Sequence, residues 1–140
     1  MGTVTETVIE TVAIIYIKSR KLLLVRPRGA MAFYMPGGKP EPGEGEVAAL
    51  RREIDEELGT AIEDLGSQPF GKYEAAAYGK PEGTRVRITC YLGGLRDSPL
   101  PQAEVDELHL FTYAEYCSMP EVAPAVVKIM EDLHARGLVA

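Results

Sequence analysis

Hydrophobic and polar positions divide this chain into short apolar segments and two longer segments with a helical period. Short runs predict strands at residues 8–17, which are rich in β-branched residues, and at 21–26, 31–35, 72–78, 85–92 and 105–111. Residues 46–58 and 124–136 repeat their apolar positions every three to four residues and predict helices. Strands before and after a central helix, followed by a terminal helix, predict an α/β fold in which helices cover a mixed sheet.

The first predicted helix has an apolar face that can reach the core. Val47, Leu50, Ile54 and Leu58 fall within a stripe about 80° wide, so we expect these side chains to be buried. Gly59 follows the last turn and suits the left-handed conformation that commonly ends a helix.

Three glutamates lie beside that apolar face and form what we call the carboxylate ledge. Glu53, Glu56 and Glu57 occupy an adjoining arc about 100° wide, with Glu57 nearest the core and Glu56 furthest from it. Carboxylates this close repel one another, and a hard divalent cation is the usual reason to keep them together. An oxygen-only ligand set suits Mg²⁺ or Mn²⁺.

A simpler interpretation of the same helix is an exposed, salt-bridged surface. Arg51–Asp55 and Arg52–Glu56 are i,i+4 pairs, which support solvated helices. The Pro-Gly-Gly loop directly before the helix favours a binding site, because glycines let the backbone approach a ligand closely.

Residues 38–60 resemble the Nudix box, which reads G, five residues, E, seven residues, R-E-U-x-E-E-x-G-U, where U is a bulky aliphatic. The matching positions are Gly38, Glu44, Arg52, Glu53, Ile54, Glu56, Glu57 and Gly59. Thr60 replaces the final aliphatic residue. The chain therefore resembles the Nudix hydrolases, in particular MutT-like nucleotide pyrophosphohydrolases.

This resemblance implies one Nudix domain over residues 1–140, built as an α/β/α sandwich with a central mixed sheet. It implies Mg- or Mn-dependent hydrolysis of a pyrophosphate bond in a nucleoside diphosphate linked to another group. A nucleoside triphosphate, modified or not, is the expected substrate. Three alternatives remain open: hydrolysis of dinucleoside polyphosphates, which the position of Tyr78 after the box favours, isomerisation of a small diphosphate, and ligand binding without hydrolysis.

The resemblance also assigns roles within the box. The implied metal ligands are the Gly37 carbonyl, Glu53, Glu56 and Glu57. Either Glu53 or Glu56 would act as general base. Arg52 would orient a carboxylate through charge-assisted hydrogen bonds, and Glu44 would have a partly structural role.

Residues outside the box are candidates for binding substrate. Arginine forks suit phosphate groups and aromatic rings suit a base, so the predicted substrate-binding residues are Arg26, Arg28, Lys39, Phe33 and Tyr78. Sites of this kind often include a further acid from a later loop, for which the candidates are Glu104, Asp106 and Glu107.

Composition narrows the expected partners and setting. With 140 residues, 46% of them hydrophobic, the chain is long enough for one domain with a real core. A net charge of −6 disfavours nucleic acid polymers and leaves a small nucleotide as the expected partner. No signal peptide or membrane span is expected, and Cys90 and Cys117 are expected to be reduced, as in the cytoplasm. The oligomeric state stays open, a homodimer included.

Overall fold

Strand β1 (Thr7–Ile15) organises a four-stranded mixed sheet in the computed structural model, which describes residues 6–140. β1 pairs in parallel with β7 (Thr84–Leu92) along its whole length. The short β4 (Gly37–Gly38) joins β1, and β6 (Gly71–Ala76) joins β7, both antiparallel, which gives the order β4-β1-β7-β6.

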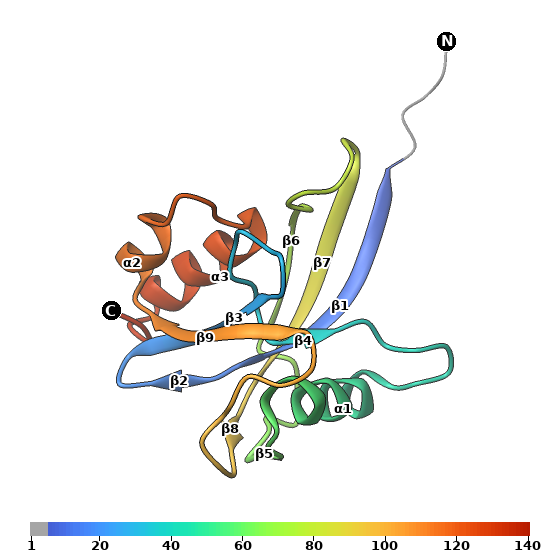
Figure 1. The fold of residues 1–140 in the computed structure, drawn as a ribbon, viewed down its shortest axis with the longest axis vertical. Helices are drawn as coiled ribbons and strands as arrows, with labels where there is room; N and C mark the ends of the chain where they lie inside the picture. Colours follow the sequence, from blue (N-terminus) through green and yellow to red (C-terminus); the bar gives the residue numbers. More distant parts are fainter. Residues whose placement is uncertain (1–5) are drawn as a thin grey trace.

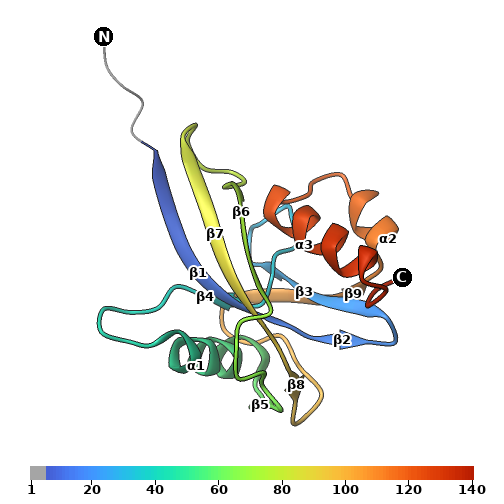
Figure 2. The same ribbon diagram turned by 180° about the vertical axis from the view of Figure 1, so that it is seen from behind.

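A smaller antiparallel sheet crosses the first one near the C-terminal end of β1 (Figures 1 and 2). Its strands are β2 (Ile17–Lys18), β3 (Lys21–Pro27) and β9 (Val105–Phe111), in the order β2-β3-β9. A separate two-stranded pair joins β5 (Ile62–Glu63) to β8 (Gly94–Leu95).

Helices lie on both sides of this arrangement (Figures 1 and 2). α1 (Glu46–Leu58) covers one side, while α2 (Tyr113–Cys117) and α3 (Pro124–Ala135) lie together on the other. The bounds of α1 are those expected, and α3 ends one residue before the expected bound. The predicted fold class, an α/β fold with helices on a central mixed sheet, is confirmed.

The alternation of side chains along β1 divides the core into two layers. Successive strand residues point to opposite faces. Val12 and Ile14 accordingly pack in the layer of α1, while Ala13 and Ile15 pack in the layer of α3. Four consecutive apolar residues therefore hold both helical layers to one strand.

Two of the predicted strands are not as expected. Residues 31–35 do not form a strand: Tyr34 makes a single isolated bridge to Val25, and the segment is held by burial of Ala32, Phe33 and Met35. The predicted strand 8–17 is divided at Tyr16 into β1 and β2, because the Tyr16 carbonyl accepts a hydrogen bond from the Leu23 N–H of β3.

The buried face of α1 also differs from the prediction at one position. Val47 has the expected angle on the helix but is 38% exposed, because it lies in the first turn, at the end of the helix. Gly59 has φ +66° and ends the helix in the left-handed conformation that was expected. The residues that α1 buries are Ala49, Leu50, Ile54 and Leu58.

Helix α2, which the apolar pattern does not reveal, connects three segments through one buried hydroxyl. Thr112 and Glu115 form a capping box that starts the helix. The Tyr116 hydroxyl donates to the Phe33 carbonyl at 2.7 Å and accepts from the Ala123 N–H at 2.9 Å. This side chain therefore joins α2 to the segment before β4 and to the start of α3.

The two cysteines and the lengths of the helices concern the environment expected for the chain. Cys90 is buried, Cys117 is exposed, and both are free thiols, as expected. Between residues 6 and 140, no helix has the length and apolar character needed to cross a membrane.

We predict that Tyr116→Phe lowers the free energy of unfolding by about 1–3 kcal/mol, because two buried main-chain groups lose their partner. Urea denaturation measures this change. Tyr16→Phe is the matched control, since the Tyr16 hydroxyl makes no hydrogen bond within residues 6–140, and it should change stability by less than about 0.5 kcal/mol. Equal losses in the two variants would contradict the role given to the Tyr116 hydroxyl.

Candidate active site

The Arg52 guanidinium links three of the acidic residues predicted for the site. Its Nε and Nη2 donate to the two carboxylate oxygens of Glu44, each at 2.9 Å, in a bidentate pair. Its Nη1 donates to Glu53 Oε1 at 2.9 Å and lies 3.6 Å from Glu56 Oε1. Arg52 therefore fixes carboxylates of the helix relative to the loop that precedes it.

Glu44 is held as a permanently charged anchor. The hydrogen bonds from Arg52, and then the N–H of Glu41 at 2.9 Å, lower the pKa of Glu44 to about 2. Its side chain is 18% exposed, so the pair with Arg52 is largely shielded from water. Both carboxylate oxygens are occupied by these donors, which is the arrangement expected of a structural residue.

Glu57 is the most deeply placed member of the carboxylate ledge. Burial raises the pKa of Glu57 to about 7, against the lowering effect of the Gly37 N–H, which donates to Glu57 Oε1 at 2.9 Å. The charges of Glu53 and Glu56 raise it further. Without a cation, the ledge thus binds a proton near neutral pH, because three adjacent negative charges are unfavourable in a partly buried site.

The glycine loop (residues 37–38) lies so close to α1 and β1 that side chains cannot be accommodated. Gly37 has φ +148°, and a Cβ there would lie 2.0 Å from the Val12 carbonyl oxygen. A Cβ on Gly38 would lie 2.5 Å from Glu53 Cδ. Main chain therefore packs directly against the carboxylate ledge, which residues without a Cβ allow.

The donor set of the ledge fits a hard divalent cation. Within residues 6–140, no three His, Cys, Asp or Glu side chains are already arranged around a metal position. Glu53 and Glu57 each use one oxygen in the bonds given above and retain the other. Mg²⁺ commonly takes one or two carboxylates and completes its shell with water and substrate phosphates, so an incomplete protein shell suits it.

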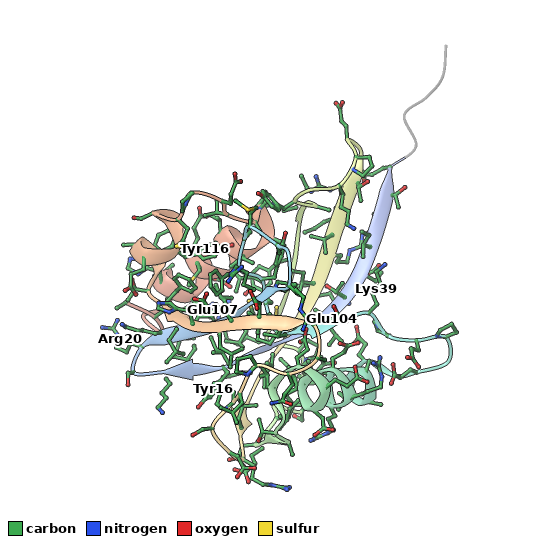
Figure 3. The ribbon with its side chains drawn as sticks, in the orientation of Figure 1. Tyr16, Arg20, Lys39, Glu104, Glu107 and Tyr116 are labelled. Atoms are coloured by element: carbon green, nitrogen blue, oxygen red, sulfur yellow. The ribbon has the colours of Figure 1, made fainter. Side chains whose placement is uncertain are left out.

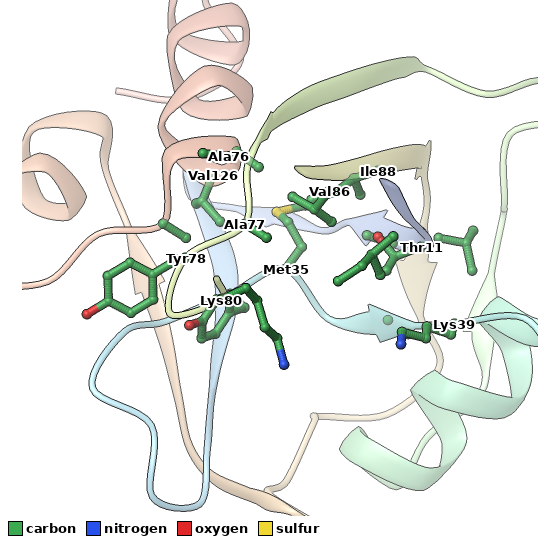
Figure 4. Close-up of a pocket in the computed structure, with 18 residues that line it drawn as sticks. Thr11, Met35, Lys39, Ala76, Ala77, Tyr78, Lys80, Val86, Ile88 and Val126 are labelled. Atoms are coloured by element: carbon green, nitrogen blue, oxygen red, sulfur yellow. The ribbon is translucent and has the colours of Figure 1, made fainter. Parts of the chain in front are cut away.

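An apolar cavity of about 260 Å³ lies on the other side of the glycine loop (Figure 4). Its walls come from β1, β6, β7, the segment before β4 and the start of α3. Met35, Ile88 and Val126 are among its apolar lining residues (Figure 4). Gly37 and Gly38 line it as well, so the cavity and the carboxylate ledge share these two residues.

Two lysines bring positive charge to this cavity. Lys39 and Lys80 both line it, both are exposed, and neither forms an ion pair within the described part of the chain. Lys39 was predicted as a substrate residue, whereas Lys80 was not. The Gly-rich loop at 79–83 next to Tyr78 was the signal that could have indicated it, because loops between strands often carry binding residues.

Tyr78 also lines the cavity, and its contact with a substrate stays a prediction. Its ring lies 6.3 Å from the ring of Tyr34, at an angle of 58°. The Tyr78 hydroxyl donates to the Glu121 carboxylate, and this bond raises the pKa of Tyr78 to about 12. The phenol is therefore neutral at physiological pH.

The structure places Arg26, Arg28 and Phe33 outside the lining of this cavity. Arg26 Nη2 pairs with Asp106 at 3.2 Å and with Glu107 at 3.1 Å. Arg28 donates to a main-chain carbonyl in the loop before β9, and Phe33 is 4% exposed within the core. Contact of these three residues with a substrate stays a prediction.

The three candidates for a further acid differ in their surroundings. Asp106 and Glu107 are both paired with Arg26. Glu104 directly precedes β9 (Figure 3), is exposed, and makes no ion pair within residues 6–140. Glu104 is thus the candidate whose carboxylate is free to contact a ligand, and its participation stays a prediction.

The chain is similar to a known family of protein domains in sequence. The sequence profile of the NUDIX domain matches residues 8–133. A comparison with curated protein sequences found no match.

Solved structures similar to this chain include Nudix proteins. The chain is 27% identical to the E. coli ORF135 protein, with a TM-score of 0.72, covering 93% of this chain and 91% of that one. It is 26% identical to a NUDIX hydrolase from Nitrosomonas europaea, with a TM-score of 0.69 and coverage of 94% and 90%. The MutT protein from Methanosarcina mazei Go1 shares the fold at 18% identity, with a TM-score of 0.75 and coverage of 94% and 96%.

We predict that metal-free wild-type protein loses stability relative to Glu57→Gln as pH rises. The folded-state pKa of Glu57, about 7, lies above its ordinary value of 4.5, so the folded state holds more protons between these values. Its stabilising proton is fully present below pH 4.5 and is lost as pH rises through 7. Between about pH 5 and about pH 8, wild type should lose about 2–3 kcal/mol more than the variant.

Urea denaturation in the presence of a chelator measures this difference. Glu82→Gln, a substitution on the exposed loop between β6 and β7, is the matched control and should follow wild type at both pH values. If the stability of Glu57→Gln changes with pH as that of wild type does, the Glu57 carboxyl does not have the raised pKa described above.

Proposed function

This chain belongs to the Nudix domain family, and we propose that it hydrolyses a pyrophosphate bond in a nucleoside diphosphate linked to another group, with Mg²⁺ or Mn²⁺ as cofactor. Membership of this family makes it a hydrolase. The substrate that we propose is a nucleoside triphosphate, modified or unmodified, which would be cleaved to a monophosphate and pyrophosphate.

The observation that carries this proposal is the position of the glycine loop between the carboxylate ledge and the apolar cavity. Gly37 contacts Glu57 through its N–H and also lines the cavity. A nucleotide with its base in the cavity would therefore extend its phosphates across the loop towards the ledge. Lys39 and Lys80, which line the cavity without ion-pair partners in the described residues, would balance part of the phosphate charge.

The residues that we propose to hold the cation are the Gly37 carbonyl, Glu53, Glu56 and Glu57. A bound divalent cation supplies positive charge that stabilises phosphate oxygens as negative charge develops on the leaving group. Arg52 positions Glu53 by a 2.9 Å hydrogen bond, and Glu44 in turn holds Arg52. The carboxylates are thereby arranged before substrate binds, which lowers the cost of reorganisation during the reaction.

A water that attacks phosphorus must lose a proton to a nearby base. Glu53 and Glu56 are the two candidates, and their carboxylates lie 2.9 Å and 3.6 Å from Arg52 Nη1. Glu53 is 20% exposed and Glu56 is 54% exposed, so they differ in their access to water. The proposal assigns the base to this pair.

Dinucleoside polyphosphates are the second candidate substrates. The favouring observation is that Tyr34 and Tyr78 both line the cavity and offer aromatic surface to a base. Ligand binding without hydrolysis is less well supported, because binding alone does not require three repelling carboxylates on one turn.

The proposed setting follows from charge and cysteine chemistry. The net charge of −6 supports a small nucleotide as partner in preference to a nucleic acid polymer. Free thiols at Cys90 and Cys117 support a reducing compartment, the cytoplasm. The oligomeric state, a homodimer included, stays open.

We predict that Mg²⁺ or Mn²⁺ is required for hydrolysis, and that Glu56→Gln and Glu57→Gln each lower turnover by roughly 10²-fold or more, because each removes a charged ligand. Phosphate release is measured by malachite green across a nucleotide panel, with and without inorganic pyrophosphatase. Glu82→Gln, on an exposed loop, should keep full turnover.

Product identity separates the two candidate substrates. Pyrophosphate released from a mononucleotide supports the leading proposal, whereas asymmetric cleavage of a dinucleotide with no mononucleotide activity supports the second. Full turnover in excess chelator, or wild-type turnover in both glutamine variants, would exclude the proposed role of the carboxylate ledge.

We also predict that Lys80→Ala raises KM by roughly fivefold to tenfold with little change in kcat. An exposed ammonium on a loop would attract phosphate in the ground state and the transition state alike, which is uniform binding. Initial rates at several salt concentrations measure the effect, which should shrink as salt screens the charge. Lys72→Ala, on β6 and outside the cavity lining, is the matched control. An unchanged KM with a strongly reduced kcat would contradict this role.

A further inference from the structure

We infer that this enzyme does not discriminate between nucleobases of the same size, because the cavity offers no side chain with a fixed pattern of hydrogen-bond donors and acceptors. The inference rests on the proposed function, in which the cavity holds the base of a nucleoside triphosphate. It concerns the selectivity of that site.

Eighteen residues line the cavity, and most of them are apolar or glycine. No Asn, Gln, Asp, Glu, Arg or His side chain is among them. Asn, Gln, Asp, Glu and Arg, together with Lys, are the side chains that read the edge of a base through bonds of defined direction. The polar side chains that do line the cavity belong to Thr11, Tyr34, Tyr78, Lys39 and Lys80.

A hydroxyl group without a partner responds equally to donors and acceptors. A hydroxyl can rotate to donate to a carbonyl or to accept from an amine, so it pairs with either kind of base edge. The Tyr78 hydroxyl already donates to Glu121, and the Thr11 hydroxyl lies 3.5 Å from the Arg87 carbonyl oxygen. The Tyr34 hydroxyl makes no hydrogen bond within residues 6–140 and is the group available to a base.

The lysines only donate and would favour bases rich in acceptors, but they are exposed, which weakens this preference. In Figure 4, the Lys80 ammonium points away from Met35, Val86 and Ile88, which form the apolar interior. Lys39 lies beside the glycine loop, on the side of α1. Both ammonium groups are therefore better placed for phosphates than for the edge of a base.

Several main-chain groups beside the cavity are also occupied. Tyr34 exchanges both of its main-chain hydrogen bonds with Val25, and the Ala77 N–H donates to the Thr84 carbonyl. Binding of the base would then depend mainly on apolar contact and ring stacking. These interactions respond to the size of the base and very little to its substituents.

The test is a comparison of kcat/KM within two size classes of nucleotide. ATP, GTP and purine riboside triphosphate, which lacks exocyclic groups, form one class, and CTP and UTP form the other. We expect values within about tenfold in each class, since a side-chain pair that reads a base edge gives roughly tenfold or more. A larger ratio within either class would overturn the inference.

A binding measurement keeps this test separate from the proposed function. Calorimetric titration with AMP, GMP and purine riboside monophosphate should give dissociation constants within the same tenfold range. If no triphosphate is hydrolysed, the proposed function fails, and even or uneven binding of the monophosphates still decides the inference.

Tyr34→Phe tests the one available hydroxyl. We expect kcat/KM to change by a common factor for all five nucleotides, because an ambivalent group contributes similarly to each. Melting temperatures confirm that the variant is folded. A change that differs by more than about tenfold between nucleotides of one size class would show that the hydroxyl reads the base, against the inference.

Discussion

The close contact between the glycine loop and α1 is the constraint on which the rest of the site depends. A Cβ at Gly37 would meet the β1 backbone at 2.0 Å, and one at Gly38 would meet the Glu53 carboxylate at 2.5 Å. The loop can therefore pair with β1 and touch the helix at once, as the bond from Gly37 to Glu57 requires. This contact fixes the carboxylates at the edge of the sheet, directly beside the cavity.

Electrostatic balance then decides which carboxylates are available. Arg52 is surrounded by acids, and its donors are shared between both oxygens of Glu44 and one oxygen of Glu53. Glu57 has no cationic partner in the described structure, and burial makes its charge unfavourable. A site that binds a proton in place of a cation is expected to release that proton when the cation arrives, so cation affinity and pH are coupled through this one residue.

Local sequence signals predicted the bounds of the box helix and the relative burial of its glutamates. The bounds of α1 and the order of exposure along the ledge follow from helical periodicity and short-range steric rules. The cavity could not be predicted, because its walls include Lys80 and Val126, which only tertiary packing brings together. Thr60, where the family pattern has an aliphatic residue, is still buried, and its hydroxyl accepts the Asp97 N–H at 2.9 Å. Sequence could not reveal that distant partner.

The parallel pairing of β1 with β7 also sets the order of events during synthesis. Thr7 lies opposite Thr84, so β1 is translated well before β7, the strand with which it pairs in parallel. At ordinary rates of translation the delay is roughly 4–15 seconds, and in that time β1 has only the two residues of β4 as a partner in its sheet. The central pair of the sheet therefore cannot form until β7 has been translated, and nascent chains stalled before residue 84 should depend on chaperones to shield β1.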